Sequence, residues 1–198
     1  MRRKSTDRAR RSIIASCVGW RKDVWTNIFQ TLAAASGPPA QLLINSSAEK
    51  LIAALRAERG ELNQATGRSR GGRATKIHAL ADHLCRPAAF LLTGGQVADC
   101  VAADALLDRM PPTTILNGDK GYNGDAVRRK IESKGAAPNI PPKANRRWKN
   151  CFSPVLYRQR NAIERMFGRL KDFRRIATRY DRLAQIFLAA VCLAAIMC

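Results

Sequence analysis

The chain has 198 residues, which is enough for one domain with a sizeable core. Lys and Arg number 35 against 15 Asp and Glu, so the formal net charge is +20 at pH 7. This excess indicates a polyanionic partner, because every phosphate that a side-chain cation neutralises releases counterions. The six cysteines show no CxxC spacing and no paired histidines accompany them, so the sequence argues against a zinc site.

The two ends of the chain differ in character. Residues 1–23 form a basic arm, for which a nucleic-acid contact and a disordered remnant are both open interpretations. Its apolar run, residues 13–18, is too short for an export signal, so we expect a cytosolic protein. Residues 24–35 have helical spacing, and the Ser-Gly-Pro-Pro at 36–39 ends that helix. The apolar run at 183–198 is short for a membrane span and predicts a buried helix.

Between these ends, short apolar runs alternate with stretches of helical spacing. The expected strands are residues 41–44, 75–81, 88–93, 113–117 and 137–140. The expected helices are residues 46–59, 97–110, 123–134 and about 181 onward, with basic loops at residues 60–73 and 141–154. A three-strand meander followed by alternating helices and strands predicts an α/β fold, a mixed sheet flanked by helices with ribonuclease H-like architecture. Ligands gather at the strand carboxyl ends of such a sheet, where Asn45 and Asp119 fall.

The stretch from Tyr157 to Lys171 has the spacing of an amphipathic helix. At about 100° per residue, four of its polar side chains fall in one stripe: Tyr157, Arg160, Glu164 and Lys171. The adjacent face is apolar and can dock on a core; it consists of Leu156, Ile163, Phe167 and Leu170. One carboxylate flanked by cations suits a metal-dependent phosphoryl-transfer site, and the alternative is an ordinary amphipathic helix with solvated charges.

Several stretches resemble the insertion-sequence transposases of the DDE type, specifically the insertion-sequence-five family. They are GRSRGGRATKIHALAD, FLLTGGQVADC, ILNGDKGYNGDAVRR, IPPKANRRWKN and LYRQRNAIERMFGRLKDFRRIATRYDRLA. The resemblance extends from about Gly67 to Ala195 and more weakly over Leu43–Ser47. The family's tyrosine, arginine, glutamate and lysine signature is reproduced in the 157–171 stretch, and the DKGY motif precedes it at residues 119–122.

The resemblance implies a recombinase that cuts transposon ends and joins the freed 3′-hydroxyl to target DNA. In such enzymes three carboxylates hold two Mg²⁺ (or Mn²⁺) ions, which stabilise the attacking and leaving oxygens. Asp119 corresponds to the second carboxylate and Glu164 to the third, while Arg160 and Lys171 would contact phosphates beside the metals. The expected partners are the transposon ends and target DNA, with a homodimer in the synaptic complex, and DNA would associate the protein with the nucleoid.

Other polar residues have competing interpretations. Asp119 can also be read as a plain turn residue, Asp99 as a packing or capping residue, and His78 as a hydrogen-bonded strand residue rather than a ligand. Two loops beside the expected site are basic, and we favour DNA contact over solvated charge for their cations and one aromatic residue. These residues are Arg68, Arg70, Arg73, Lys143, Arg146, Arg147, Trp148 and Lys149.

The chain departs from the family pattern at its first carboxylate. The family has I-D-S-S or I-D-S-T where this chain reads Ile44-Asn45-Ser46-Ser47, so a neutral amide replaces a charged ligand. The segment 50–59, KLIAALRAER, replaces a basic, glycine-rich family loop, and we interpret it as a compensated frameshift that the coding DNA would reveal. Residues 1–40 are then a basic arm with a remnant helical region, and residues 41–198 the catalytic domain.

These departures leave two functional hypotheses and a less favoured third. The first is a transposase that cleaves and joins DNA, and the second is a catalytically inactive DNA-binding remnant of one. A basic RNA-binding structural protein is the third, and the 157–171 signature argues against it.

Overall fold

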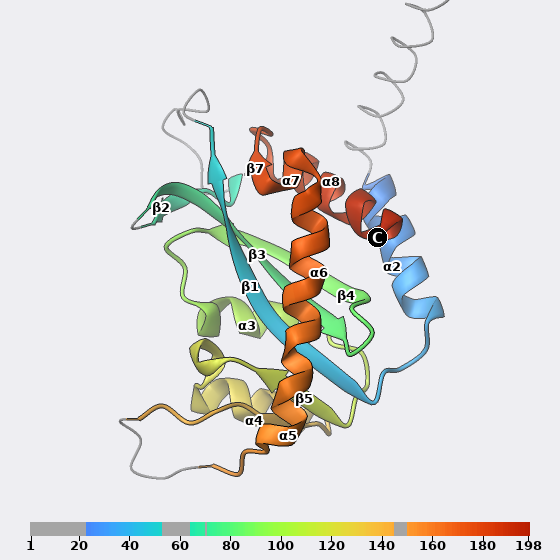
Figure 1. Cartoon of the computed structure of the whole chain (residues 1–198), viewed down its shortest axis with the longest axis vertical. Helices are drawn as coiled ribbons and strands as arrows, with labels where there is room; N and C mark the ends of the chain where they lie inside the picture. The colour runs from blue at the N-terminus through green and yellow to red at the C-terminus, as the bar shows by residue number, and fades with distance from the viewer. Residues whose placement is uncertain (1–22, 53–63, 70, 145–149) are drawn as a thin grey trace, which may run out of the picture.

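The computed structural model describes residues 23–52, 64–69, 71–144 and 150–198 (Figure 1). These residues build one seven-stranded sheet with helices on both faces. The strands are β1 (Gln41–Leu51), β2 (Gly67–Ser69), β3 (Gly72–Asp82), β4 (Pro87–Gly94), β5 (Ile115–Gly118), β6 (Ala137–Asn139) and β7 (Thr178–Arg179).

The long strand β1 lies at the centre of the sheet. It pairs antiparallel with β3 on one side and parallel with β5 on the other. β4 and the short β2 both pair antiparallel with the outer edge of β3, and β6 continues the parallel half beyond β5. β7 pairs in parallel with the last residues of β1. An antiparallel meander thus leads into parallel strands, which confirms the mixed α/β sheet predicted from the sequence.

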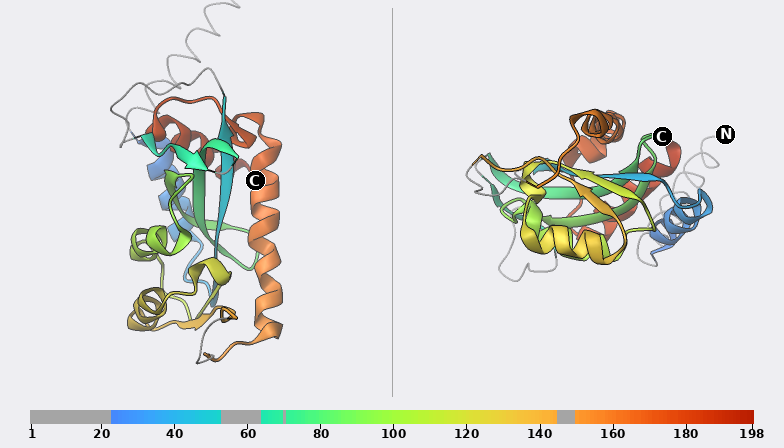
Figure 2. Two further views of the ribbon diagram at one scale, coloured as in Figure 1. Left: turned by 90° about the vertical axis from the view of Figure 1, so that its left-hand side faces the viewer. Right: turned by 90° about the horizontal axis from the view of Figure 1, so that it is seen from below.

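Helices cover the two faces of the sheet, as the view from below shows (Figure 2). α6 packs on one face together with α2 and α8, and α3 and α4 pack on the other. The helices are α2 (Val24–Ala35), α3 (Asp99–Asp108), α4 (Asp125–Ser133), α5 (Pro154–Tyr157), α6 (Asn161–Asp172), α7 (Arg174–Ala177) and α8 (Ala184–Met197). Two 3₁₀ turns complete the description, η2 (Lys120–Tyr122) and η3 (Arg158–Arg160).

Alternation along the strands divides the core into two layers. Leu43 of β1 and Ile77 of β3 pack against α6 and α8, whereas Ile44 and Leu80 pack against α3 and α4. This follows from the period of two in a strand, which sends successive side chains to opposite faces. The predicted C-terminal buried helix is confirmed as α8, and no helix among the described residues is long and apolar enough to cross a membrane.

The predicted helix at residues 46–59 is wrong where the structure describes it. Residues 46–51 continue β1, and Leu42 to Lys50 pair without interruption with Asp82 to Ala74 of β3. The local sequence favours a helix, but helix propensity amounts to tenths of a kcal/mol per residue, and a complete hydrogen-bonded ladder with β3 outweighs it. Residues 53–59 lie outside the described residues.

The predicted loop at residues 60–73 is also wrong in part. β2 and the start of β3 form a short antiparallel ribbon within it, with Gly67 opposite Ala74. β3 begins at Gly72, whose φ of +106° is one that a residue with a side chain rarely adopts. The paired residues of this ribbon include too few apolar side chains to give a periodic signal, so the sequence did not predict it.

Arg179 ties the C-terminal segment to the edge of the sheet. Its side chain is fully buried, and its guanidinium donates to the hydroxyl of Thr75 at 2.6 Å and to the carbonyl oxygens of Gln64, Asp181 and Arg182. It also lies 5.1 Å from the ring centroid of Phe187. One side chain therefore links β3, β7 and the start of α8.

Candidate active site

Asn45 and Asp119 lie on neighbouring strands at the place where β1 and β5 separate. The parallel register runs from Gln41 opposite Ile115 to Ile44 opposite Gly118, so the next step brings Asn45 beside Asp119. Neighbouring strands are about 4.8 Å apart, which puts the two side chains within reach of one ligand. Asn45 lies inside β1 rather than at its end, which corrects the predicted strand boundary.

The DKGY motif folds as a strand followed by a tight turn. Asp119 is the residue before the 3₁₀ turn η2, and its Oδ1 accepts a hydrogen bond from the backbone N–H of Gly121 at 2.8 Å. The space around Gly121 is narrow, because a Cβ there would lie 2.9 Å from Oδ1 of Asp119 and 3.0 Å from Oδ2 of Asp99. A larger residue at position 121 would displace these carboxylate groups, so glycine keeps Asp119 where the turn presents it.

The signature stretch brings a second set of polar groups to the same place. Arg160 donates a hydrogen bond to Glu164, and its guanidinium lies 5.4 Å from the ring centroid of Tyr157. Burial raises the pKa of Tyr157, and the nearby charges of Asp119 and Glu164 raise it further while Arg160 lowers it. α5 contacts β5, so the stretch begins beside the strand that Asp119 follows. The predicted continuous helix is divided into α5, η3 and α6.

Lys171 lies away from this group, at the far end of α6. It is seven residues from Glu164, or about 10 Å along a helix. Its ammonium lies 3.2 Å from Oε1 of Glu49, a buried carboxylate of β1 on the same face as Asn45. Ser47 donates to the same carboxylate oxygen at 2.7 Å. The sequence predicted that Lys171 lies in one stripe with Glu164. The structure shows that its ion-pair partner is Glu49.

Asp99 and His78 belong to the opposite face of the sheet. Asp99 is the first residue of α3 and accepts hydrogen bonds from Ser46 at 2.9 Å and from Lys76 at 3.2 Å. His78 is fully buried between the hydroxyl groups of Thr93 and Tyr122, and this burial lowers its pKa to about 4. His78 is thus the hydrogen-bonded strand residue that the sequence favoured. Asp99 does not cap α3, whose N-cap is Ala98, and it is held by a hydrogen bond and an ion pair.

Sequence reasoning missed a buried clamp that fixes the start of α5. Nδ2 of Asn139 donates to Oδ1 of Asn117 at 2.7 Å and to the carbonyl oxygen of Ser153 at 3.1 Å. Oδ1 of Asn139 accepts from the backbone N–H of Ser153 at 2.8 Å. Asn139 and Asn117 are register partners on β6 and β5. A polar residue inside an otherwise apolar strand segment is the one signal that could have identified Asn139.

We expect Asn139→Ala to loosen the signature stretch. The substitution leaves the backbone N–H of Ser153 and the buried side chain of Asn117 without their partner, which costs about 2 kcal/mol. Urea unfolding should show this loss, and amide hydrogen exchange should accelerate over Ser153–Tyr157. The matched control is Asn161→Ala at an exposed position of α6, which should change neither measurement appreciably. Equal effects of the two substitutions would contradict the clamp.

The predicted basic residues are placed only in part. Arg68, Arg73 and Lys143 are exposed to solvent, as DNA contact requires. The other members of the predicted set lie outside the described residues: Arg70, Arg146, Arg147, Trp148 and Lys149. Their contact with DNA stays a prediction.

The residues at the site do not fit a pair of Mg²⁺ ions. No group of three or more His, Cys, Asp or Glu that could hold a metal ion occurs among the described residues. The family positions supply two carboxylates and the neutral amide of Asn45, whose Oδ1 already accepts from the N–H of Ser46 at 2.9 Å. Glu164 is paired with Arg160. Two divalent cations need more negative charge than this set provides.

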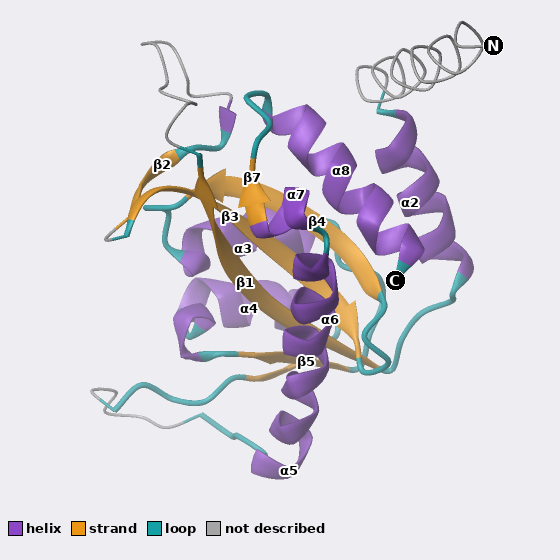
Figure 3. Ribbon diagram, turned by 45° about the horizontal axis from the view of Figure 1, so that its top comes forward, coloured by secondary structure: helices purple, strands orange, loops and turns teal. Residues whose placement is uncertain are grey.

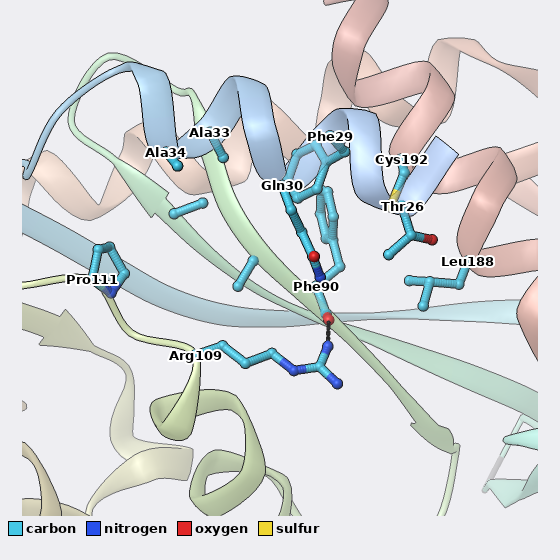
Figure 4. Close-up of a pocket in the computed structure, with 12 residues that line it drawn as sticks. Thr26, Phe29, Gln30, Ala33, Ala34, Phe90, Arg109, Pro111, Leu188 and Cys192 are labelled. Carbon is cyan, nitrogen blue, oxygen red and sulfur yellow. Dashed lines mark hydrogen bonds between the residues drawn. The ribbon is translucent and has the colours of Figure 1, made fainter. Parts of the chain in front are cut away.

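An apolar pocket of about 360 Å³ lies elsewhere, between α2, β4 and α8 (Figure 4). Phe29 and Phe90 form part of its wall, and Arg109 donates to the carbonyl oxygen of Phe90 at 2.9 Å. The one nucleophilic group on it is the thiol of Cys192, whose pKa is raised by burial to about 11, so it stays protonated at neutral pH. The pocket therefore offers no reactive group to compete with the site at Asp119.

Comparison with known proteins identifies a matching family and two similar sequences. The sequence profile of the family described as "Transposase DDE domain" matches residues 56–198, a range that begins after Asn45. A Brucella ovis protein named as a transposase for insertion sequence element IS6501 is 32% identical over 124 residues, which cover 62% of this chain and 95% of that protein. A Burkholderia cepacia protein named as a transposase for insertion sequence element IS402 is 33% identical over 132 residues, covering 61% of this chain and 59% of that protein.

The fold is also found among solved structures. The cryo-EM structure of the piggyBac transposase synaptic complex with hairpin DNA superposes with a TM-score of 0.50 over 80% of this chain and 45% of that one, at 10% sequence identity. At this identity the likeness concerns the fold alone, and it confirms the ribonuclease H-like architecture that the element order predicted. The chain spans about half the length of that transposase and of the second sequence relative.

Proposed function

Because this chain belongs to the family of transposase DDE domains, we propose that it binds DNA as a transposase core whose cleavage and strand-transfer step is limited by Asn45. The family consists of phosphoryl-transfer enzymes that typically use divalent metal ions. The observation that carries the proposal is that Tyr157 and Glu164 both contact Arg160, in a stretch whose first helix, α5, contacts β5. Asp119 follows β5, next to Asn45 in the register of the sheet.

The residues of the site have distinct tasks in this proposal. Arg160 would hold a phosphate of the bound strand, since a guanidinium matches a phosphate with two parallel hydrogen bonds. Its present partner Glu164 is 48% exposed, so the pair can open toward solvent when DNA arrives. Tyr157 lies under the guanidinium and limits its movement. Lys171, 42% exposed, would contact a phosphate further along the strand.

Asp119 and Glu164 are the two carboxylates that would hold a divalent cation, which would supply positive charge beside the phosphate. Asn45 can offer an oxygen to a cation but no charge, and its amide oxygen is turned toward its own backbone neighbour. We therefore assign the limit on the reaction to this residue rather than to the signature stretch.

The same proposal assigns domains and partners to the rest of the chain. We propose residues 41–198 as the catalytic domain, with α2 packed on it through Phe29, and residues 1–22 as part of a basic N-terminal arm. DNA ends and target DNA are the proposed partners, and pairing of two ends would bring two copies of the chain together. A protein held by DNA in this way would be found with the nucleoid in the cytoplasm.

A second candidate is a transposase relative that binds DNA but no longer joins it. The observation that favours it is the incomplete donor set at Asn45. Such a chain could occupy transposon ends and interfere with an intact relative.

One experiment decides between the two candidates. The natural chain is incubated with labelled duplexes that carry the repeats flanking its own coding sequence, with Mg²⁺ or Mn²⁺, and joined products are counted. Slow joining that disappears in Glu164→Ala, while DNA binding persists, is the result expected for the transposase. Binding without any joining in either protein would favour the second candidate, and absence of binding would contradict both.

A further inference from the structure

Two arginines face each other on the short ribbon formed by β2 and β3. Arg68 and Arg73 are direct cross-strand partners, and both side chains are exposed. Side chains in such a pair stand about 5 Å apart at Cβ, and like charges directly opposite destabilise a sheet. Among the residues that the structure describes, neither arginine side chain makes an ion pair or hydrogen bond. The described part of the chain thus places two cations together and pairs neither with a carboxylate.

The surface around this pair is hollow. A groove of about 780 Å³ is lined by both arginines, by Gly67 and Gly94, and by Gln96. The side-chain amide of Gln96 packs against Gly67 and Gly94, where a Cβ would overlap it. A groove with two unpaired guanidinium groups at its edge suits an anion with several oxygen acceptors.

The arginine pair lies on the same face of the sheet as the candidate active site. Arg73 and Ala79 are an even number of residues apart on β3, so their side chains share a face, and Ala79 is the direct partner of Asn45. Six residues of strand separate Arg73 from that position, or about 20 Å. The ribbon lies at the end of the sheet that is opposite α5 (Figures 1 and 3).

We propose that Arg68 and Arg73 together bind one phosphate of the DNA strand that lies across the site at Asn45 and Asp119. This deepens the proposed function and rests on it. A distance of about 20 Å corresponds to about six base pairs of B-form DNA, in which successive phosphates of one strand are about 3.4 Å apart along the axis. The ribbon would hold the duplex at that distance from the reacting phosphate and would also relieve its own charge repulsion by doing so.

The test uses the full chain and a fluorescent 30-base-pair duplex of arbitrary sequence, with affinity measured by anisotropy over a series of salt concentrations. The variants are Arg68→Gln, Arg73→Gln and the double substitution. The matched control is Arg129→Gln, an exposed arginine of α4 on the other face of the molecule. Each single substitution should weaken binding by about fivefold, and the control should leave it unchanged.

The salt dependence shows whether the two arginines share a phosphate. Loss of one phosphate contact lowers the slope of log affinity against log salt by about 0.9. The double variant should therefore lose about 0.9, whereas two separate contacts would cost about 1.8. A loss of about 1.8, or no loss, would overturn the shared site. If the natural chain binds DNA and the arginine variants bind it as tightly as the control variant does, the ribbon proposal fails and the proposed function stands. If the natural chain does not bind DNA, both fail.

Thermal unfolding of the free protein supplies an independent readout. Because each substitution removes a like-charge contact, the variants should unfold at the same temperature as the natural chain or a higher one. Weaker DNA binding together with a lower unfolding temperature would overturn the proposal, since the arginines would then be structural.

Discussion

Replacing Asn45 with aspartate is expected to raise metal-dependent strand joining by on the order of 100-fold, which corresponds to about 2.7 kcal/mol of transition-state stabilisation. The change adds one negative charge beside Asp119, at the point where the register of β1 and β5 brings the two residues together. It is nearly isosteric, so the ladder with β3 should be unaffected. Joining of labelled DNA ends in Mg²⁺ or Mn²⁺ measures the effect, with DNA affinity as the parallel measurement.

The control for this prediction separates charge from packing. Asn45→Ala removes the amide without adding a carboxylate, so joining should not rise above that of the natural chain. Asp99 also has a carboxylate close to Asp119, on the other side of Gly121, but Ser46 and Lys76 hold its Oδ1. An Asn45→Asp chain that binds DNA normally and still does not join it would contradict our assignment of the defect to one residue.

Arg179→Met is expected to lower the free energy of unfolding by about 3 kcal/mol. The guanidinium is fully buried, and its loss leaves the hydroxyl of Thr75 and several backbone carbonyl oxygens without a donor. Methionine preserves much of the volume of the side chain, so the loss reflects hydrogen bonding rather than a cavity. Urea unfolding measures it.

The matched control is Arg174→Met. Arg174 lies in the same segment with an exposed side chain, so the substitution should cost less than about 1 kcal/mol. Equal losses for Arg174 and Arg179 would contradict the role of Arg179 as the tie between β3 and the C-terminal segment.

Much of the fold could be predicted because its elements carry strong periodic signals. The helix at Val24–Ala35 and the hairpin of β3 and β4 are confirmed near their predicted bounds. The sequence failed where pairing across the sheet decides the outcome. Residues 46–51 have helical propensity and become strand because β3 supplies a partner for them. The β2–β3 ribbon gave no periodic signal because it is short and polar.

The candidate site was predictable where spacing along one element determines it. Tyr157, Arg160 and Glu164 lie within a few helical turns of one another, and Asp119 lies between a strand and the turn at Gly121. The partners that cross between elements were not predictable. Glu49 meets Lys171, and Asn139 holds Ser153, through the register of the sheet and the docking of α6. No local pattern contains that information.

Titration of Mn²⁺ into the natural chain, Asn45→Asp, and Asn45→Asp combined with Glu164→Gln tests the central claim most directly. Affinity for a hard cation rises with the number of charged oxygen ligands. We predict weak binding by the natural chain, binding at least about tenfold tighter by Asn45→Asp, and loss of that gain when Glu164 is also neutralised. Binding by the natural chain as tight as by Asn45→Asp would contradict the claim that Asn45 limits this transposase core.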